Sequence, residues 1–189
     1  MNKFIQNGAI AEYKEIDPTF KGRIGRIPPN ATSVAMHCRL GFHAALLGAD
    51  LEDNDDPLNG WYRAADFAVE ARLVKSTLLK IPHHGSKGAH SDKAWAALCC
   101  PPLSAVVTPF RKGTHLPTVG DQLRIKKMAG IAYLTHAPQD FPEVKHKTAS
   151  KLMQGLDSSQ HIGGVQFRIN MCVETDRWKA NPFGGAILL

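Results

Sequence analysis

The segment Thr77–Ser86 reads TLLKIPHHGS: an apolar run followed at once by two adjacent histidines, a glycine and a serine. The run Thr77–Ile81 predicts a buried strand, and the proline and glycine that follow predict a turn. His83 and His84 are therefore expected just beyond the carboxyl end of a strand. In layered α/β folds, ligand and metal sites gather at that edge of the sheet.

Upstream of this segment the sequence predicts a β-hairpin and then a helix. Residues 31–40 (ATSVAMHCRL) and 42–47 (FHAALL) are largely apolar runs separated by a turn at Gly41. Asp50 stands where the second run ends. The spacing of apolar residues along Trp61–Val74 favours a helix. Asp50 is thus expected at a strand end, as His83 and His84 are.

Downstream, predicted strands and helices alternate, which indicates an α/β layered domain. The expected elements are a helix over Asp92–Cys99 capped by Ser91 and halted by Pro101-Pro102, a strand over Ser104–Thr108, a helix over Thr118–Met128 ending with Gly130 at its C-cap, a strand over Ile131–Thr135, a helix over Ala149–Leu156 and a strand over Gly164–Val173. His136 follows the Ile131–Thr135 strand directly. The tail NPFGGAILL receives no assignment.

The bulk composition indicates one globular domain. A chain of 189 residues with 43% hydrophobic content can bury a core, and we divide it into an irregular arm over Met1–Asn30 and a domain over residues 31–189. No apolar stretch approaches the roughly 20 residues of a membrane span, and no apolar signal core precedes the first charges. We therefore expect a cytoplasmic protein without membrane contact. The four cysteines form no C-x-x-C pair, so reduced, buried thiols are expected.

The net charge of +6 suits phosphate-rich partners such as nucleic acid or nucleotides. The basic residues form no long run, however, so a solvated surface explains them about as well.

Four side chains at predicted strand ends are candidate metal ligands: Asp50, His83, His84 and His136. Carboxylate and imidazole ligands suit zinc, and a mixed set also admits manganese or iron. The structural alternatives are a turn aspartate at Asp50 and loop histidines hydrogen-bonded to the backbone at His83 and His84. Ser86 is either a donor that orients a ligand or a plain turn serine.

Three strings in this sequence resemble the C-terminal half of metallo-β-lactamase-fold hydrolases, in the branch that includes the extracytoplasmic domain of competence DNA-uptake channels. They are NATSVAMHCRLGFHAALLGADLE, LLKIPHHGSKGAHSDKAWAAL and SAVVTPFRKGTHLPTVGDQLRIKKMAGIAYLTH, and together they cover about residues 30–136. The Pro-His-His-Gly-Ser motif is the most specific of their features.

The resemblance implies a fold, a set of residue roles and a cofactor. The fold would be half of an αββα sandwich, a mixed sheet with helices on one face and a partner half on the other. Asp50 matches the bridging metal aspartate, and His136 the final metal histidine. The His83-His84 pair matches a position that ligates metal or protonates a leaving oxygen; we assign His84 to the metal and His83 to catalysis. The cofactor would be a divalent metal, zinc in the first place and manganese in the second.

One family signature is absent from the sequence: the nine histidines include no H-x-H pair, and so no His-x-His-x-Asp-His cluster. The resemblance therefore implies that a second chain, or a second copy of this one, completes the site. Two functions follow as hypotheses. One is a subunit of a metal-dependent phosphodiesterase or nuclease, inactive as an isolated chain. The other is a non-catalytic binding or regulatory subunit built on the same fold.

Overall fold

The computed structural model describes residues 30, 33–53, 58–110, 115–136 and 163–189. Six strands form one mixed sheet in the order β1-β2-β3-β4-β5-β8, and two more form a separate ribbon, β6-β7. Their bounds are Met36–Leu40 (β1), His43–Leu47 (β2), Ser76–Lys80 (β3), Cys99–Val107 (β4), Ile131–Leu134 (β5), Gly164–Arg168 (β6), Lys179–Phe183 (β7) and Ile187–Leu188 (β8). The α/β class expected from the sequence is confirmed.

The strands that carry the candidate residues run side by side in the same direction. β2, β3, β4 and β5 pair in parallel, whereas β1 and β8 add antiparallel edges. The β1–β2 hairpin turns at Gly41, whose φ of +60° is one that glycine adopts at little cost. The carboxyl ends of the four parallel strands therefore meet along one edge of the sheet.

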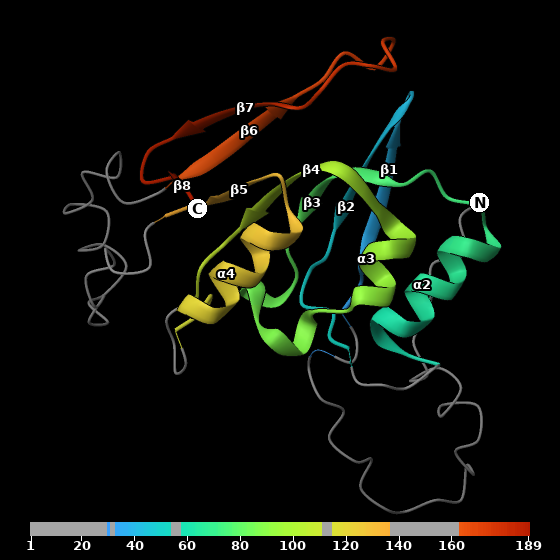
Figure 1. Cartoon of the computed structure of the whole chain (residues 1–189), viewed down its shortest axis with the longest axis horizontal. Coiled ribbons are helices and arrows are strands. Elements are labelled where there is room, and N and C mark those ends of the chain that lie inside the picture. Colours follow the sequence, from blue (N-terminus) through green and yellow to red (C-terminus); the bar gives the residue numbers. More distant parts are fainter. Residues whose placement is uncertain (1–29, 31–32, 54–57, 111–114, 137–162) are drawn as a thin grey trace, which may run out of the picture.

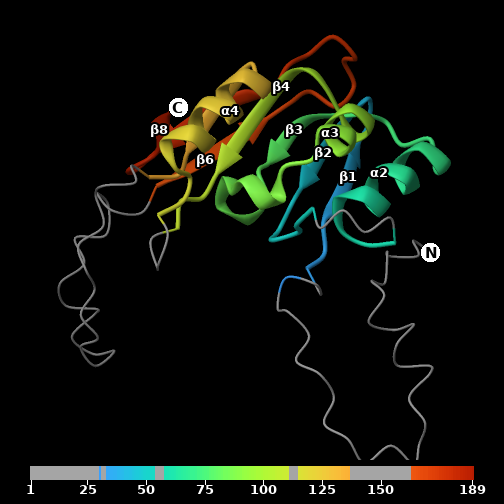
Figure 2. The same ribbon diagram turned by 60° about the horizontal axis from the view of Figure 1, so that its bottom comes forward.

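Three helices pack on one face of this sheet and form the core with it. They are α2 (Gly60–Glu70), α3 (Asp92–Leu98) and α4 (Val119–Met128), and Figures 1 and 2 show them on the same side. Leu46, Leu79, Ala105 and Ala132 stand in one register row across the parallel strands, and all are buried against the helices. Trp61 of α2 is fully buried in the same cluster and contacts Trp95 of α3.

The opposite face of the sheet is partly covered by the chain itself. In Figure 1 the β6–β7 ribbon lies along the side of the sheet away from the helices. The Phe167 ring packs edge-on against Tyr133, with centroids 6.1 Å apart, and Trp178 Nε1 donates to Thr77 Oγ1 at 2.9 Å. The sequence analysis predicts that this face packs on a partner half. For the part of the face that the ribbon covers, that prediction is wrong. The tail NPFGGAILL, which received no assignment from the sequence, contributes to β7 and forms β8. The ribbon that covers part of this face was therefore not predicted.

Several predicted element boundaries were wrong. Pro101-Pro102 do not halt α3 but lie inside β4, and the helix already ends at Leu98. α4 ends at an extended Ala129, so Gly130 is not its left-handed cap. α2 stops at Glu70, short of Val74, and the strand predicted over Gly164–Val173 ends at Arg168. The predicted helix Ala149–Leu156 lies outside the described residues. The same holds for the predicted arm Met1–Asn30, of which only Asn30 is described.

The four cysteines are free, as expected, but only Cys99 is buried; Cys172 is exposed. Cys172 is exposed because it lies in the connection between β6 and β7. Among the described residues, no helix has the length and apolar character needed to cross a membrane.

Candidate metal centre

The candidate residues lie in the loops that follow the carboxyl ends of the parallel strands. Asp50 follows β2, His83 and His84 follow β3, and His136 follows β5. The β4 end contributes a backbone carbonyl at Thr108, which contacts His84. The sheet topology thus brings together residues that are far apart in the sequence, as the strand-end pattern predicted.

The His83-His84-Gly85 turn has an uncommon backbone. All three residues have positive φ, at +40°, +54° and +81°. For a residue with a side chain this left-handed conformation costs on the order of 1–3 kcal/mol, and it persists only where surrounding contacts impose it. Here the His83 N–H donates to Ala49 O at 2.9 Å and the Ser86 N–H to His83 O at 3.0 Å. Ala49 also has positive φ, +46°, so both loops of the site are strained.

His84 is fixed in one orientation and one tautomer. Its Nδ1 lies 2.8 Å from Thr108 O, and its ring stacks on Phe110 with centroids 4.7 Å apart and planes 23° from parallel. Because a carbonyl oxygen only accepts, Nδ1 must carry the hydrogen of this bond. In the neutral ring Nε2 then presents a lone pair, the arrangement found in metal-binding histidines whose other nitrogen donates to a carbonyl.

A carboxylate oxygen lies near His84 Nε2. Nε2 lies 3.9 Å from Asp50 Oδ1, a carboxylate oxygen on a side chain that is 51% exposed. The Asp50 backbone N–H donates to Ser33 Oγ at 2.9 Å, which holds the loop. Two acceptor atoms at this separation are compatible through a proton on Nε2, through a water molecule that donates to both, or through a cation bound by both. The predicted proximity of Asp50 and His84 is confirmed.

A second close pair lies beside the first. His83 Nδ1 is 2.7 Å from Glu52 Oε1, although the angle is not that of a hydrogen bond. The same carboxylate oxygen accepts from Asn30 Nδ2 at 3.0 Å. Glu52 is not among the candidate ligands predicted from the sequence, because it is one of four acidic residues between Asp50 and Pro57. The available signal was its spacing, two residues after Asp50 in the loop that faces the histidines.

His136 is placed at the same edge of the sheet. It is buried, and its Nδ1 lies 3.3 Å from Thr135 Oγ1. Over the residues that the structure describes, no group of three or more His, Cys, Asp or Glu side chains is arranged to hold a metal ion. The structure therefore assembles two of the predicted ligands, Asp50 and His84, and the role of His136 stays a prediction.

A cationic side chain stands near Asp50. Lys80, the last residue of β3, is half-buried on the face away from the helices, and its Nζ donates to Ile81 O at 2.8 Å. Burial lowers the pKa of Lys80, and the Asp50 carboxylate offsets part of that effect. The site thus carries one ammonium group close to its carboxylates.

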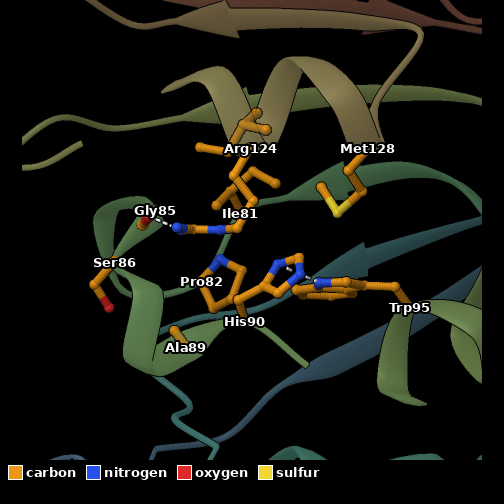
Figure 3. Close-up of a pocket in the computed structure, with 10 residues that line it drawn as sticks. Ile81, Pro82, Gly85, Ser86, Ala89, His90, Trp95, Arg124 and Met128 are labelled. Atoms are coloured by element: carbon orange, nitrogen blue, oxygen red, sulfur yellow. Dashed lines mark hydrogen bonds between the residues drawn. The ribbon is translucent and has the colours of Figure 1, made fainter. Parts of the chain in front are cut away.

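The space behind the histidine turn is closely filled. It is lined by residues of the turn, of the loop after it and of α3 and α4, among them Gly85, His90, Trp95 and Arg124 (Figure 3). Trp95 Nε1 donates to His90 Nδ1 at 2.8 Å, so His90 belongs to the packing of α3. Arg124 points at the turn and contacts it directly.

Comparisons with protein-family models, with curated proteins and with solved structures find no match for this chain.

Proposed function

We propose that this chain supplies half of a divalent-metal site to a hydrolase of phosphodiesters, and that it forms the C-terminal half of a metallo-β-lactamase-type αββα sandwich. One observation carries the proposal: the hydrogen on His84 Nδ1 is engaged by Thr108 O, and Nε2, the ring nitrogen left to bind a metal, lies 3.9 Å from Asp50 Oδ1. In a neutral histidine the lone pair of Nε2 gains no stability from a carboxylate beside it, whereas a cation bound by both atoms stabilises the pair.

The donor set fits a metal. Asp50 Oδ1 and His84 Nε2, which lie 3.9 Å apart, would be its two ligands from the described residues. One imidazole nitrogen and one carboxylate oxygen suit zinc first and manganese second. Such a metal supplies Lewis acidity, which makes water more acidic and draws charge from an attacked phosphate oxygen.

The chain's own residues divide the remaining work. Thr108 O and Phe110 orient the His84 ring. His83 is the proposed proton donor to the leaving oxygen, with the Glu52 carboxylate beside its Nδ1. Lys80 offers a positive charge to an anionic substrate, and the net charge of +6 is compatible with nucleic acid or a nucleotide.

The described residues bring two of the predicted ligands together, Asp50 and His84, and a hydrolytic site needs more. A hydrolytic metal needs about three protein ligands, and the 189-residue sequence contains no His-x-His-x-Asp-His cluster. We propose that a second chain carrying that cluster, or a homo-oligomeric arrangement, completes the site. The competing function is a non-catalytic binding or regulatory subunit, and the missing cluster favours it as well.

The two functions are separated by purifying the chain from its native host with its partner and assaying hydrolysis of single-stranded DNA and of a nitrophenyl phosphodiester. The proposal expects zinc or manganese in the complex, turnover that a chelator abolishes, and no useful turnover by the chain alone.

Substitution tests the role of the pair in the same assay. Asp50→Ala should remove activity from the complex, because it deletes one of the two ligands that face each other. The matched control is Asp92→Ala, whose carboxylate is 98% exposed on α3 and which should leave turnover unchanged. A partner without metal ligands and a complex without turnover would favour the non-catalytic alternative.

A further inference from the structure

The first turn of α4 is built as a buried, rigid cap. Thr118 and Asp121 form a reciprocal capping box: the Asp121 N–H donates to Thr118 Oγ1 at 3.2 Å, and the Thr118 N–H donates to Asp121 Oδ2 at 2.9 Å. Asp121 is only 5% exposed. Burial alone would raise the pKa of Asp121, but the hydrogen bonds from Thr118 and Arg124 outweigh it and lower the pKa. The carboxylate is therefore a fixed negative anchor.

Arg124 connects this anchor to the histidine turn. Its Nη1 donates to Asp121 Oδ1 at 2.6 Å, and its Nη2 donates to Gly85 O at 2.7 Å, as Figure 3 shows for the Gly85 end. The planar guanidinium keeps the two bonds in a fixed relation. Gly85 also lies close against α4, since a Cβ built on it would come within 2.9 Å of Ile125 Cδ1 and a side chain therefore has no room there. The turn is thus held on α4 by the two hydrogen bonds of Arg124 and by the close packing of Gly85.

We propose that Arg124 is a positioning residue for the candidate site, because it imposes the left-handed turn from which His84 aims Nε2 at Asp50. The strained backbone of His83 and His84 persists only where surrounding contacts stabilise it. The hydrogen bond from Arg124 to Gly85 O acts on the residue next to His84. Without it the Gly85 carbonyl loses a charge-assisted partner and the turn relaxes toward ordinary φ values. The His84 ring then leaves Thr108 O, and its tautomer is no longer fixed. The consequence for metal binding rests on the proposed function, whereas the consequence for the tautomer does not.

The experiment is ¹⁵N NMR of the histidine rings in the metal-free full chain, which reports which nitrogen carries hydrogen. The wild type should hold His84 with hydrogen on Nδ1. Arg124→Met, which keeps the length and removes the donors, should give exchange between both tautomers. Arg124→Lys, which retains one charged donor, should restore the Nδ1–H form in part. The matched control is Arg63→Met, which breaks an arginine–carboxylate pair with Glu70 on the exposed side of α2 and should leave His84 unchanged.

A folded Arg124→Met chain whose His84 keeps the wild-type tautomer would overturn the proposal. If Arg124→Met does not fold, the Arg124→Lys chain decides: a His84 that keeps the Nδ1–H form as fully as the wild type would contradict the proposal.

A Zn²⁺ titration then separates this proposal from the proposed function. The affinity at His84 should fall about 10–100-fold in Arg124→Met, the usual effect of removing a residue that orients a ligand. If Zn²⁺ does not bind at His84 in the wild type, the proposed function fails, while the tautomer result still decides the role of Arg124.

Discussion

The left-handed backbone at His83 and His84 shows how single residues carry this site. Neither side chain favours that conformation, and yet two such residues stand side by side at the end of a buried strand. The cost is met by contacts that all converge there: Ala49 O, Thr108 O and Arg124. Strained residues held by their surroundings cluster at functional sites, and this observation is independent of the sequence motif.

A second residue-scale consequence concerns Cys99. Burial raises the pKa of this thiol to about 12, so the thiolate that reacts with alkylating reagents is scarce at neutral pH. We expect iodoacetamide to modify the exposed Cys172 within minutes and to leave Cys99 unmodified in the folded chain. Peptide mass spectrometry after a short labelling pulse measures both. Labelling of Cys99 as fast as of Cys172 would show that the Cys99 region opens.

The raised pKa of Cys99 also links stability to pH. A thiol whose folded pKa lies above its unfolded value favours the folded state while it is neutral, so its contribution is fully present below the unfolded pKa of about 9. It is lost as the pH rises toward 12. The free energy of unfolding of the wild type should therefore fall over this range more steeply than that of Cys99→Ala.

At the scale of the elements, the end of α2 is a Schellman motif with an unfavourable residue. The Leu73 N–H donates to Ala68 O and the Arg72 N–H to Val69 O, and Arg72 occupies the left-handed position at φ +50°. Glycine is preferred there because it has no Cβ. Arg72→Gly should therefore raise the free energy of unfolding by about 0.5–1 kcal/mol.

The control for this prediction is Arg72→Ala. It removes the same exposed side chain but keeps the Cβ, so urea unfolding should show no gain in stability. Equal stabilisation by both variants would mean that the arginine side chain, not the backbone, is the unfavourable feature.

Some of the secondary-structure elements could be predicted from the sequence and others could not. β2, β3, β4 and β5 are short apolar runs bounded by turn residues, and Ser91 caps α3 through its Oγ as expected. Their prediction needs only local pattern. β8 and the pairing of β6 with β7 depend on which distant strand or ring is available, such as Tyr133 for Phe167, and local pattern does not contain that information. A Pro-Pro pair likewise reads as a helix stop, although here it lies in a strand.

The same distinction applies to the site. Asp50 and His84 were predictable because parallel strands bring their carboxyl ends to one edge, whatever the details of packing. Thr108 takes part through its backbone carbonyl, and a backbone contact does not depend on the residue type. Arg124, which is 39 positions further along the chain than Gly85, contacts the turn from α4. Residues that act through a carbonyl or across the fold leave no signal in spacing.

At the scale of the whole molecule, the sheet has one face fully packed and one face partly open. The register places Met36, Leu47, Lys80, Val106, Tyr133 and Leu188 in a single row across all six strands of the main sheet, pointing away from the helices. The β6–β7 ribbon contacts Tyr133, while Met36 and Leu47 stay exposed. A partner half, as proposed, would cover this remaining surface next to the site.

The proposed half-site is tested most directly by titrating the isolated chain with Zn²⁺ while recording the ¹⁵N signals of the histidine rings. We predict weak, reversible binding in which His84 Nε2 shifts most among the resolved histidines, and loss of that shift in Asp50→Ala. His43, whose Nε2 is engaged by Val173 O, is the internal control and should stay unchanged. Saturating Zn²⁺ that leaves His84 unmoved would contradict the account, as would tight stoichiometric zinc with metal-dependent turnover in the lone chain.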